Sequence, residues 1–154
     1  MIPKAGIFLD ASVLLAAAGS PQGGSSAAIA QVAHSEEFEV LVSSQVLREA
    51  LGNVRLKFGQ AAVIRLYTLL AQLQPRLVGP RESAAPANLP ASVAVKDHHI
   101  LQACVAAGAS ICLTLDRRHL LSEDVRRWGI ERDLRLLTPG EFLAWHRLRA
   151  EGRG

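Results

Sequence analysis

The sequence predicts an α/β fold, a three-layer α/β/α sandwich with a central, mostly parallel sheet. Short apolar runs, typical of strands buried on both faces, alternate along the chain with longer segments of helical periodicity. Strands that alternate with helices in this way favour a parallel sheet covered by helices on both sides. Hydrophobic residues make up 49% of the 154 residues and charged residues 20%, which is the balance of a globular chain rather than a disordered one.

The predicted strands are short apolar runs bounded by turn-forming residues. The fourth of them is the clearest, and both it and the first strand end in an aspartate. In chain order the predicted strands are Gly6–Asp10, Phe38–Val42, Arg76–Gly79, Ser110–Asp116 and Leu134–Leu137.

The predicted helices lie between these strands. Serines are expected to cap the first two, Ser25 or Ser26 in one and Ser43 or Ser44 in the other, and Pro75 ends the third. A last helix begins with a threonine cap, a proline at its first position and a glutamate at its third, as in a capping box. In chain order, the first helix runs from its serine cap at Ser25 or Ser26 to about His34, and the second from Ser43 or Ser44 to about Lys57. The others run from about Gln60 to Gln74, from Lys96 to Ala107, from about Ser122 to Trp128, and onward from Thr138-Pro-Gly-Glu141.

One domain is predicted at residues 1–150, followed by a short tail at 151–154. The stretch Gly79–Pro90 contains three prolines and is expected to be a loop, because too little chain lies on either side of it for two cores. We recognise no signal peptide and expect no membrane span. The two cysteines, Cys104 and Cys112, lack CxxC spacing, so neither a disulfide framework nor a zinc cage is expected, and a reducing, cytoplasmic location fits best.

The net charge of +3 comes entirely from the end of the chain. Residues 1–116 hold eight basic and eight acidic side chains, whereas residues 117–154 hold nine arginines and six acids. Arginine suits bidentate contact with phosphate, so a polyanionic partner fits this pattern. A high-GC genome that favours arginine codons explains it equally well.

Two aspartates stand at the ends of predicted strands. Asp10 ends the first strand and Asp116 the fourth. Ligand sites in parallel sheets lie beyond the carboxyl ends of the strands, so the two carboxylates would lie side by side if these strands are neighbours. The competing interpretation of Asp10 alone is a turn residue or a helix cap.

Asp97 is a third candidate. At about 100° per residue, Leu101, Cys104 and Val105 fall within about 80° of it, which places the carboxylate on the apolar face of its helix. It is therefore expected to cap the helix, to face the edge of the sheet where Asp10 lies, or to do both.

Glu49 is a weaker candidate by periodicity. It lies opposite the apolar side of its helix, between Gln45 and Asn53, as on a solvated polar face. His98 and His99, which follow Asp97, are more simply explained as ordinary helix or surface histidines than as substrate contacts. The same holds for His119.

Crowded carboxylates repel one another unless a cation neutralises them. Mg²⁺ and Mn²⁺ prefer oxygen ligands and fit this set best. Such ions lower the pKa of bound water and clamp phosphodiesters.

At this point the sequence resembles the PIN-domain family and, within it, the VapC-like toxin ribonucleases. The motifs follow the family's order along nearly the whole chain. They are Phe8-Leu-Asp10-Ala-Ser12, Ser44-Gln-Val-Leu-Arg-Glu49, Lys96-Asp97-His-His-Ile-Leu-Gln-Ala103, Leu113-Thr-Leu-Asp116-Arg-Arg-His-Leu120 and Leu137-Thr-Pro-Gly-Glu-Phe142-Leu.

The resemblance implies an endoribonuclease that holds Mg²⁺ or Mn²⁺ between four acids. It also implies a small antitoxin partner encoded nearby and a homodimer. Ser12 and Thr114 match hydroxyl positions that support the metal site. The positions that match the family's acids are Asp10, Glu49, Asp97 and Asp116.

The chain departs from the family at two places. Related sequences often carry a further acid where this chain has Ala91–Val95, and a glycine where it has Leu115. Neither difference removes a proposed ligand, but both bear on how tightly metal is held.

The predicted function is a divalent-metal-dependent endoribonuclease of a toxin–antitoxin pair, with Arg117 and Arg118 engaging the phosphates of RNA. The alternative is a catalytically inactive PIN fold that binds RNA or protein. A phosphatase of the haloacid dehalogenase type needs a second aspartate where this chain has Ser12, and a receiver domain needs a different order of acids.

Overall fold

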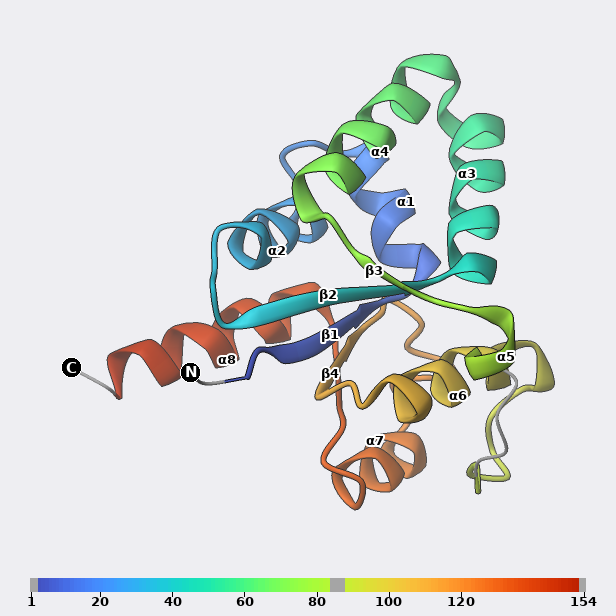
Figure 1. Cartoon of the computed structure of the whole chain (residues 1–154), viewed down its shortest axis with the longest axis vertical. Coiled ribbons are helices and arrows are strands. Elements are labelled where there is room, and N and C mark those ends of the chain that lie inside the picture. The colour runs from blue at the N-terminus through green and yellow to red at the C-terminus, as the bar shows by residue number, and fades with distance from the viewer. Residues whose placement is uncertain (1–2, 84–87, 153–154) are drawn as a thin grey trace.

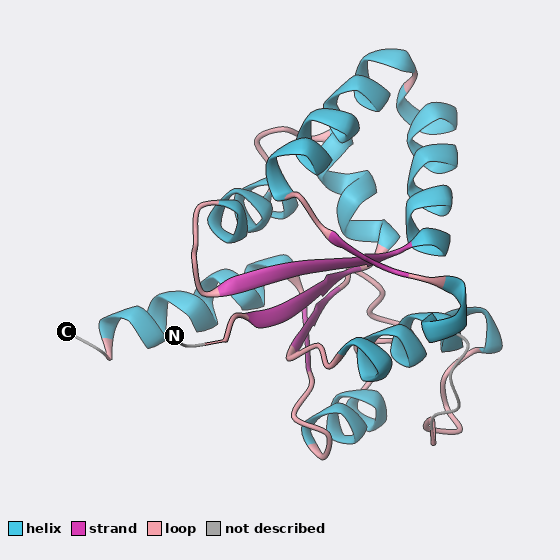
Figure 2. Cartoon of the chain, in the orientation of Figure 1, coloured by secondary structure: helices cyan, strands magenta, loops and turns pink. Residues whose placement is uncertain are grey.

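The computed structural model describes residues 3–83 and 88–152 and shows a five-stranded sheet between layers of helices (Figure 1, Figure 2). The strand order is β3-β2-β1-β4-β5, and every neighbouring pair is parallel, which confirms the predicted fold class. The strands are β1 (Ala5–Leu9), β2 (Phe38–Ser43), β3 (Arg76–Val78), β4 (Ile111–Leu113) and β5 (Arg135–Leu137).

Helices cover both faces of the sheet. In Figure 1, α1 to α4 lie above it and α6 and α7 below it, while α8 packs against α2 and β5. The helices are α1 (Ala11–Gly19), α2 (Gly24–Ala33), α3 (Ser44–Phe58), α4 (Gln60–Leu73), α5 (Pro80–Ser83), α6 (His98–Ala107), α7 (Glu123–Ile130) and α8 (Pro139–Glu151), with a 3₁₀ turn at Val95–Asp97 before α6.

The strands β1 and β4 are apolar throughout because helices bury both of their faces. Ile7 and Phe8 of β1 and Cys112 of β4 are all but inaccessible to solvent. Cys104 and Cys112 are buried free thiols. The hydrogen bond with Cys104, together with burial, raises the pKa of the Cys112 thiol well above its ordinary value, which favours the neutral thiol over a metal-binding thiolate.

Several predicted helix caps are confirmed. Ser43 accepts a hydrogen bond from the Val46 amide at 3.1 Å and caps α3. Thr138 and Glu141 form the predicted capping box of α8. Gly108 ends α6 with a φ of 67°, a left-handed conformation that glycine adopts without strain.

Other local predictions were wrong. The helix α1 was not predicted, because its residues are almost all small or apolar and show little amphipathic contrast. Gly23, rather than Ser25 or Ser26, is the N-cap residue of α2, and the Ser26 hydroxyl instead donates to the Ser20 carbonyl at 2.7 Å. The predicted loop at 79–90 begins with the short helix α5, and residues 84–87 of it lie outside the described residues.

The boundary between a domain at 1–150 and a tail at 151–154 stays a prediction. The helix α8 continues to Glu151, and Arg153 and Gly154 lie outside the described residues. Within the part of the chain that is described, no helix combines the length and the apolar character that crossing a bilayer requires.

Glu141 gives α8 a pH-dependent contribution to stability. Its two hydrogen bonds from Arg126, of 2.8 and 3.2 Å, lower the pKa of the carboxyl from 4.5 to about 2. A group with a lowered pKa in the folded state stabilises the protein above its unfolded value, so this contribution should fade as the pH falls from 4.5 to about 2. Glu141→Gln, which keeps a capping acceptor but not the charge, is expected to lower the melting temperature at neutral pH.

Thermal unfolding across a pH series tests this expectation. The difference between wild type and Glu141→Gln should shrink through the acid range. Glu123→Gln removes a more exposed ion pair, with Arg127, and should change stability little at any pH. A difference for Glu141→Gln that is independent of pH would contradict the assignment.

Candidate active site

The carboxyl ends of β1 and β4 form the edge of the sheet at which Asp10 and Thr114 lie. The chain runs from β1 to β2 on one side and places β4 on the other, so the strand order reverses between β1 and β4. Such a switch point leaves a crevice beyond the strand ends, where parallel sheets bind their ligands. The register sets Leu9 beside Leu113, and therefore brings Asp10 and Thr114 together.

Asp10 is held rigidly at this edge. It is only 6% exposed and occupies the N-cap of α1, where its Oδ1 accepts a hydrogen bond from the Ala11 amide at 2.7 Å. Its Oδ2 accepts hydrogen bonds from the hydroxyls of Ser12 at 2.9 Å and Thr114 at 2.8 Å. The interpretation of Asp10 as a helix cap is thus confirmed. The positive end of the α1 dipole stabilises its carboxylate.

Ser12 and Thr114 also fix the loop that carries Asp116. The Ser12 Oγ accepts a hydrogen bond from the Leu115 amide at 3.0 Å, and the Thr114 Oγ1 accepts one from the Asp116 amide at 3.1 Å. Each hydroxyl therefore donates to Asp10 and accepts from the loop after β4. The two side chains connect the segments after β1 and β4 into one hydrogen-bonded unit.

Asp116 does not end a strand, contrary to the sequence prediction. The strand β4 stops at Leu113, because the Thr114 side chain and the turn after it use the hydrogen-bonding groups that would continue the ladder. Asp116 lies in the following turn, where its Oδ1 accepts a hydrogen bond from the His119 amide at 3.1 Å. Thr114, and not Asp116, is the residue that directly follows the last residue of β4.

Asp97 lies immediately before α6 and is only 8% exposed. Its side chain makes no capping hydrogen bond, and its buried Oδ2 has no hydrogen-bond partner among the described residues. Burial raises the pKa of Asp97, the charges of Asp116 and Asp10 raise it further, and Lys96 partly offsets them. The three aspartates therefore share one electrostatic environment.

Glu49, on α3, contacts His99 near the start of α6. Its side chain is 43% exposed, as the polar-face interpretation predicted, and its Oε1 lies 3.5 Å from the His99 Nε2. His99 is nearly buried, at 12% exposure, so the interpretation of it as an ordinary helix histidine missed this contact. No sequence signal joins Glu49 to His99, because the contact depends on how α3 packs near α6.

Arg117 and Arg118 follow Asp116 directly and are exposed. Both residues lie in the turn that follows Asp116. The other flanking histidine, His98, is turned away, since its Nε2 contacts the Val93 carbonyl at 3.2 Å.

The side chains proposed as metal ligands have the oxygen chemistry that a hard cation prefers. All the candidate side chains are carboxylates or hydroxyls, which Mg²⁺ and Mn²⁺ prefer. The orphaned Oδ2 of Asp97, close to two like charges, is a group that a cation would satisfy. Across residues 3–83 and 88–152, no three side chains of His, Cys, Asp or Glu converge on one point. Mg²⁺ is often held by one or two carboxylates and several waters, so this spacing remains compatible with binding.

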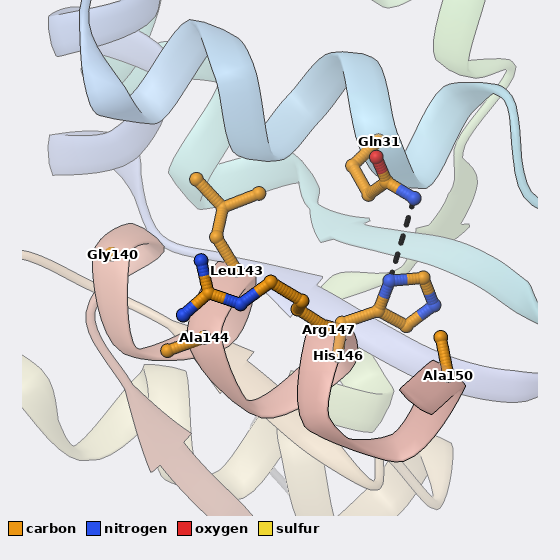
Figure 3. A pocket seen from close by; sticks show the side chains of 7 residues that line it. All are labelled: Gln31, Gly140, Leu143, Ala144, His146, Arg147 and Ala150. Atoms are coloured by element: carbon orange, nitrogen blue, oxygen red, sulfur yellow. Dashed lines mark hydrogen bonds between the residues drawn. The ribbon is translucent and has the colours of Figure 1, made fainter. Parts of the chain in front are cut away.

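A separate hollow of about 630 Å³ lies between α2 and α8 (Figure 3). Its lining includes Gln31 and His146, which are joined at 3.4 Å, and the side chain of Arg147. No candidate acid belongs to the described lining of this hollow. The candidate acids and this hollow thus lie in different parts of the fold.

Comparisons with known proteins place these observations in context. The sequence profile described as PIN domain matches residues 6–118, a segment that includes Asp10, Glu49, Asp97 and Asp116. The fold is similar to the crystal structure of VapBC2 from Rickettsia felis bound to a DNA fragment from their promoter, with a TM-score of 0.54 and 14% identity over 86% of this chain and 98% of that chain. The curated proteins searched include no match to this chain.

Proposed function

Because the chain belongs to the PIN-domain family, we propose that it is a divalent-metal-dependent endoribonuclease. The observation that carries the proposal is the electrostatic cluster of Asp10, Asp97 and Asp116, with one buried carboxylate oxygen of Asp97 unpaired. Such a cluster is unfavourable for the fold alone. It is the arrangement expected of a site that binds a cation.

The family membership and the charges that Asp10 and Asp116 exert on Asp97 support these proposed roles. Asp10, Asp97 and Asp116 would supply the ligand oxygens for Mg²⁺ or Mn²⁺, and Glu49 would complete the pocket or orient water. A bound ion supplies an activated water and stabilises charge on the phosphodiester. Ser12 and Thr114 would hold Asp10 in place through their hydrogen bonds to its Oδ2.

RNA is the proposed substrate. Arg117 and Arg118 are exposed on the loop that carries Asp116, and arginine pairs well with phosphate oxygens. The surplus of three positive charges lies in the same C-terminal part of the sequence. We propose that these two arginines position the phosphodiester backbone beside the acids.

Regulation by a small antitoxin protein is part of the same proposal. The structure to which this fold is similar contains VapBC2 together with a promoter DNA fragment. We propose that this chain is likewise the toxin of a toxin–antitoxin pair and acts as a homodimer.

Metal dependence is the experiment that tests the function. RNA of mixed sequence should be cleaved in Mn²⁺, and EDTA should abolish the cleavage. Mn²⁺ should also raise the melting temperature, since a ligand at 100 times its dissociation constant stabilises the folded state by about 2.7 kcal/mol. Adding excess Mn²⁺ after EDTA should restore both effects.

The second candidate, an inactive PIN fold that binds RNA or protein, is favoured by one observation, the lack of a converged ligand set in the described residues. It predicts neither cleavage nor a thermal shift with Mn²⁺. If it binds RNA, it predicts an affinity that falls with rising salt whether or not metal is present. Binding without cleavage under all metal conditions would reject the enzyme and support this alternative.

A further inference from the structure

A second, smaller pocket of about 180 Å³ lies between α3, α5 and α6. In Figure 1 these elements approach one another at one side of the sheet. Its described lining contains no carboxylate, and most of its side chains carry neutral hydrogen-bonding groups. The polar lining residues are Ser44, Gln45, Arg48, Ser83, His99 and Gln102.

Two polar atoms at this pocket are buried without a hydrogen-bond partner in the described structure. They are the hydroxyl of Ser83, a residue that is only 7% exposed, and the Nδ1 of His99. Buried polar groups in folded proteins are almost always paired, because an unmade hydrogen bond is unfavourable. The residues that carry these two atoms both line the pocket, so a ligand bound there with hydrogen-bonding groups is a candidate partner for them.

His99 connects this pocket to the candidate active site. His99 lines the pocket, and its Nε2 lies 3.5 Å from the Glu49 Oε1. His99 also stands two residues after Asp97 at the beginning of α6. A group bound in the pocket would therefore lie beside the contact of His99 with Glu49, near the start of α6.

The chemistry of the lining favours a nucleobase over a phosphate. The amides of Gln45 and Gln102 and the hydroxyl of Ser83 each offer both a donor and an acceptor. The edge of a nucleobase is neutral and presents both kinds of group, and unpaired RNA bases are read through such contacts. A phosphate would call for several cations, whereas Arg48 is the single cationic side chain in the described lining and is itself exposed.

We propose that this pocket binds one unpaired base of the RNA, at a fixed position relative to the cleaved phosphodiester. The inference rests on the proposed ribonuclease function. It assigns Ser83, His99 and Gln102 to base recognition and makes the pocket the source of the enzyme's sequence preference. The RNA recognised is single-stranded at that position, because a paired base could not turn its edge into the pocket.

Mapping of cleavage sites tests the proposal. Single-stranded RNA of randomised sequence is cleaved in Mn²⁺ and the products are sequenced, for wild type and for Ser83→Ala and Gln102→Leu. Wild type should prefer a base at one position near the cut, and each variant should lower that preference about tenfold, the equivalent of one neutral hydrogen bond. Gln72→Leu, an exposed glutamine on α4, is the matched control and should keep the wild-type preference.

A binding measurement keeps the test independent of catalysis. Fluorescence anisotropy with short homopolymeric RNAs is measured in EDTA with the Asp10→Asn protein, which should show the same base preference. Adding Ser83→Ala or Gln102→Leu to the Asp10→Asn protein should remove that preference. Cleavage without any base preference would overturn the pocket assignment but leave the ribonuclease intact, and so would a preference that both pocket variants retain. If wild type cleaves no RNA, the proposed function fails, and the anisotropy data alone decide whether the pocket binds a base.

Discussion

Asp10→Asn is expected to abolish RNA cleavage, with a loss of more than about 100-fold, and to leave the fold intact. Substitutions next to a metal site, which only orient its ligands, commonly lose about 10- to 100-fold, so loss of a ligand carboxylate should exceed that range. Asp10 lies at the centre of the site and its charge contributes to the raised pKa of Asp97. Asparagine removes the negative charge that a cation would neutralise.

The fold should survive because asparagine fits the hydrogen bonds of Asp10. Its amide oxygen can accept from the Ala11 amide and cap α1, a position at which asparagine and aspartate are about equally favourable. Its amide nitrogen can donate to the hydroxyls of Ser12 and Thr114, which also accept hydrogen bonds. Loss of activity would then report on chemistry rather than on unfolding.

A cleavage assay in Mn²⁺, paired with circular dichroism and a melting curve, checks this result. Asp133→Asn is the matched control, since Asp133 is exposed, lies just before β5 at the other end of the strands, and has a φ of 57° that asparagine tolerates. The control should cleave at the wild-type rate. An Asp10→Asn protein that does so as well would remove Asp10 from the site.

Thr114→Val is expected to lower cleavage about 10- to 100-fold, as for residues that orient metal ligands. Thr114 is fully buried, donates to Asp10 and accepts from the Asp116 amide. Valine has nearly the same shape but leaves the Asp116 amide unpaired and removes one of the two hydroxyl donors to the Asp10 Oδ2. The free energy of unfolding should fall by about 1–3 kcal/mol, the usual effect of an unmade buried hydrogen bond.

Thr114→Ser separates positioning from stability. Serine keeps the hydroxyl and should recover most of the cleavage rate, although the loss of a buried methyl group still destabilises the fold. The rates in Mn²⁺ and the melting temperatures of both variants provide the comparison. If serine and valine reduce the rate equally, the hydroxyl has no role in positioning the two aspartates.

The family resemblance and the local patterns gave a correct picture of the architecture. The apolar runs at Gly6–Leu9 and Ile111–Leu113 had to be buried on both faces, and only a parallel sheet between helices provides this. The caps Ser43 and Thr138 were also recognisable, because capping depends on residues within one turn.

Local patterns failed where the surroundings of a segment decide its structure. The apolar segment Ala11–Gly19 carries no periodic signal, yet it forms α1 because Asp10 caps it and the core covers it. Asp116 was predicted to end a strand, but β4 ends at Leu113. The Asp116 amide donates its hydrogen bond to the Thr114 hydroxyl and not to a neighbouring strand. Both errors concern short-range hydrogen bonds, of Ala11 with Asp10 and of Asp116 with Thr114, which hydrophobic periodicity does not reveal.

The sequence by itself thus determined the fold class, the order of the strands and three of the acids to consider, Asp10, Asp97 and Asp116, since these follow from local periodicity and residue chemistry, whereas Glu49 came from the family resemblance. Only the tertiary structure decided how those acids relate to one another. It joined Asp10 to Thr114 across 104 positions of sequence, left an oxygen of Asp97 unpaired, and set His99 between Glu49 and a polar pocket. These relations depend on the register of β1 against β4 and on the packing of α3 near α6, which no single segment encodes.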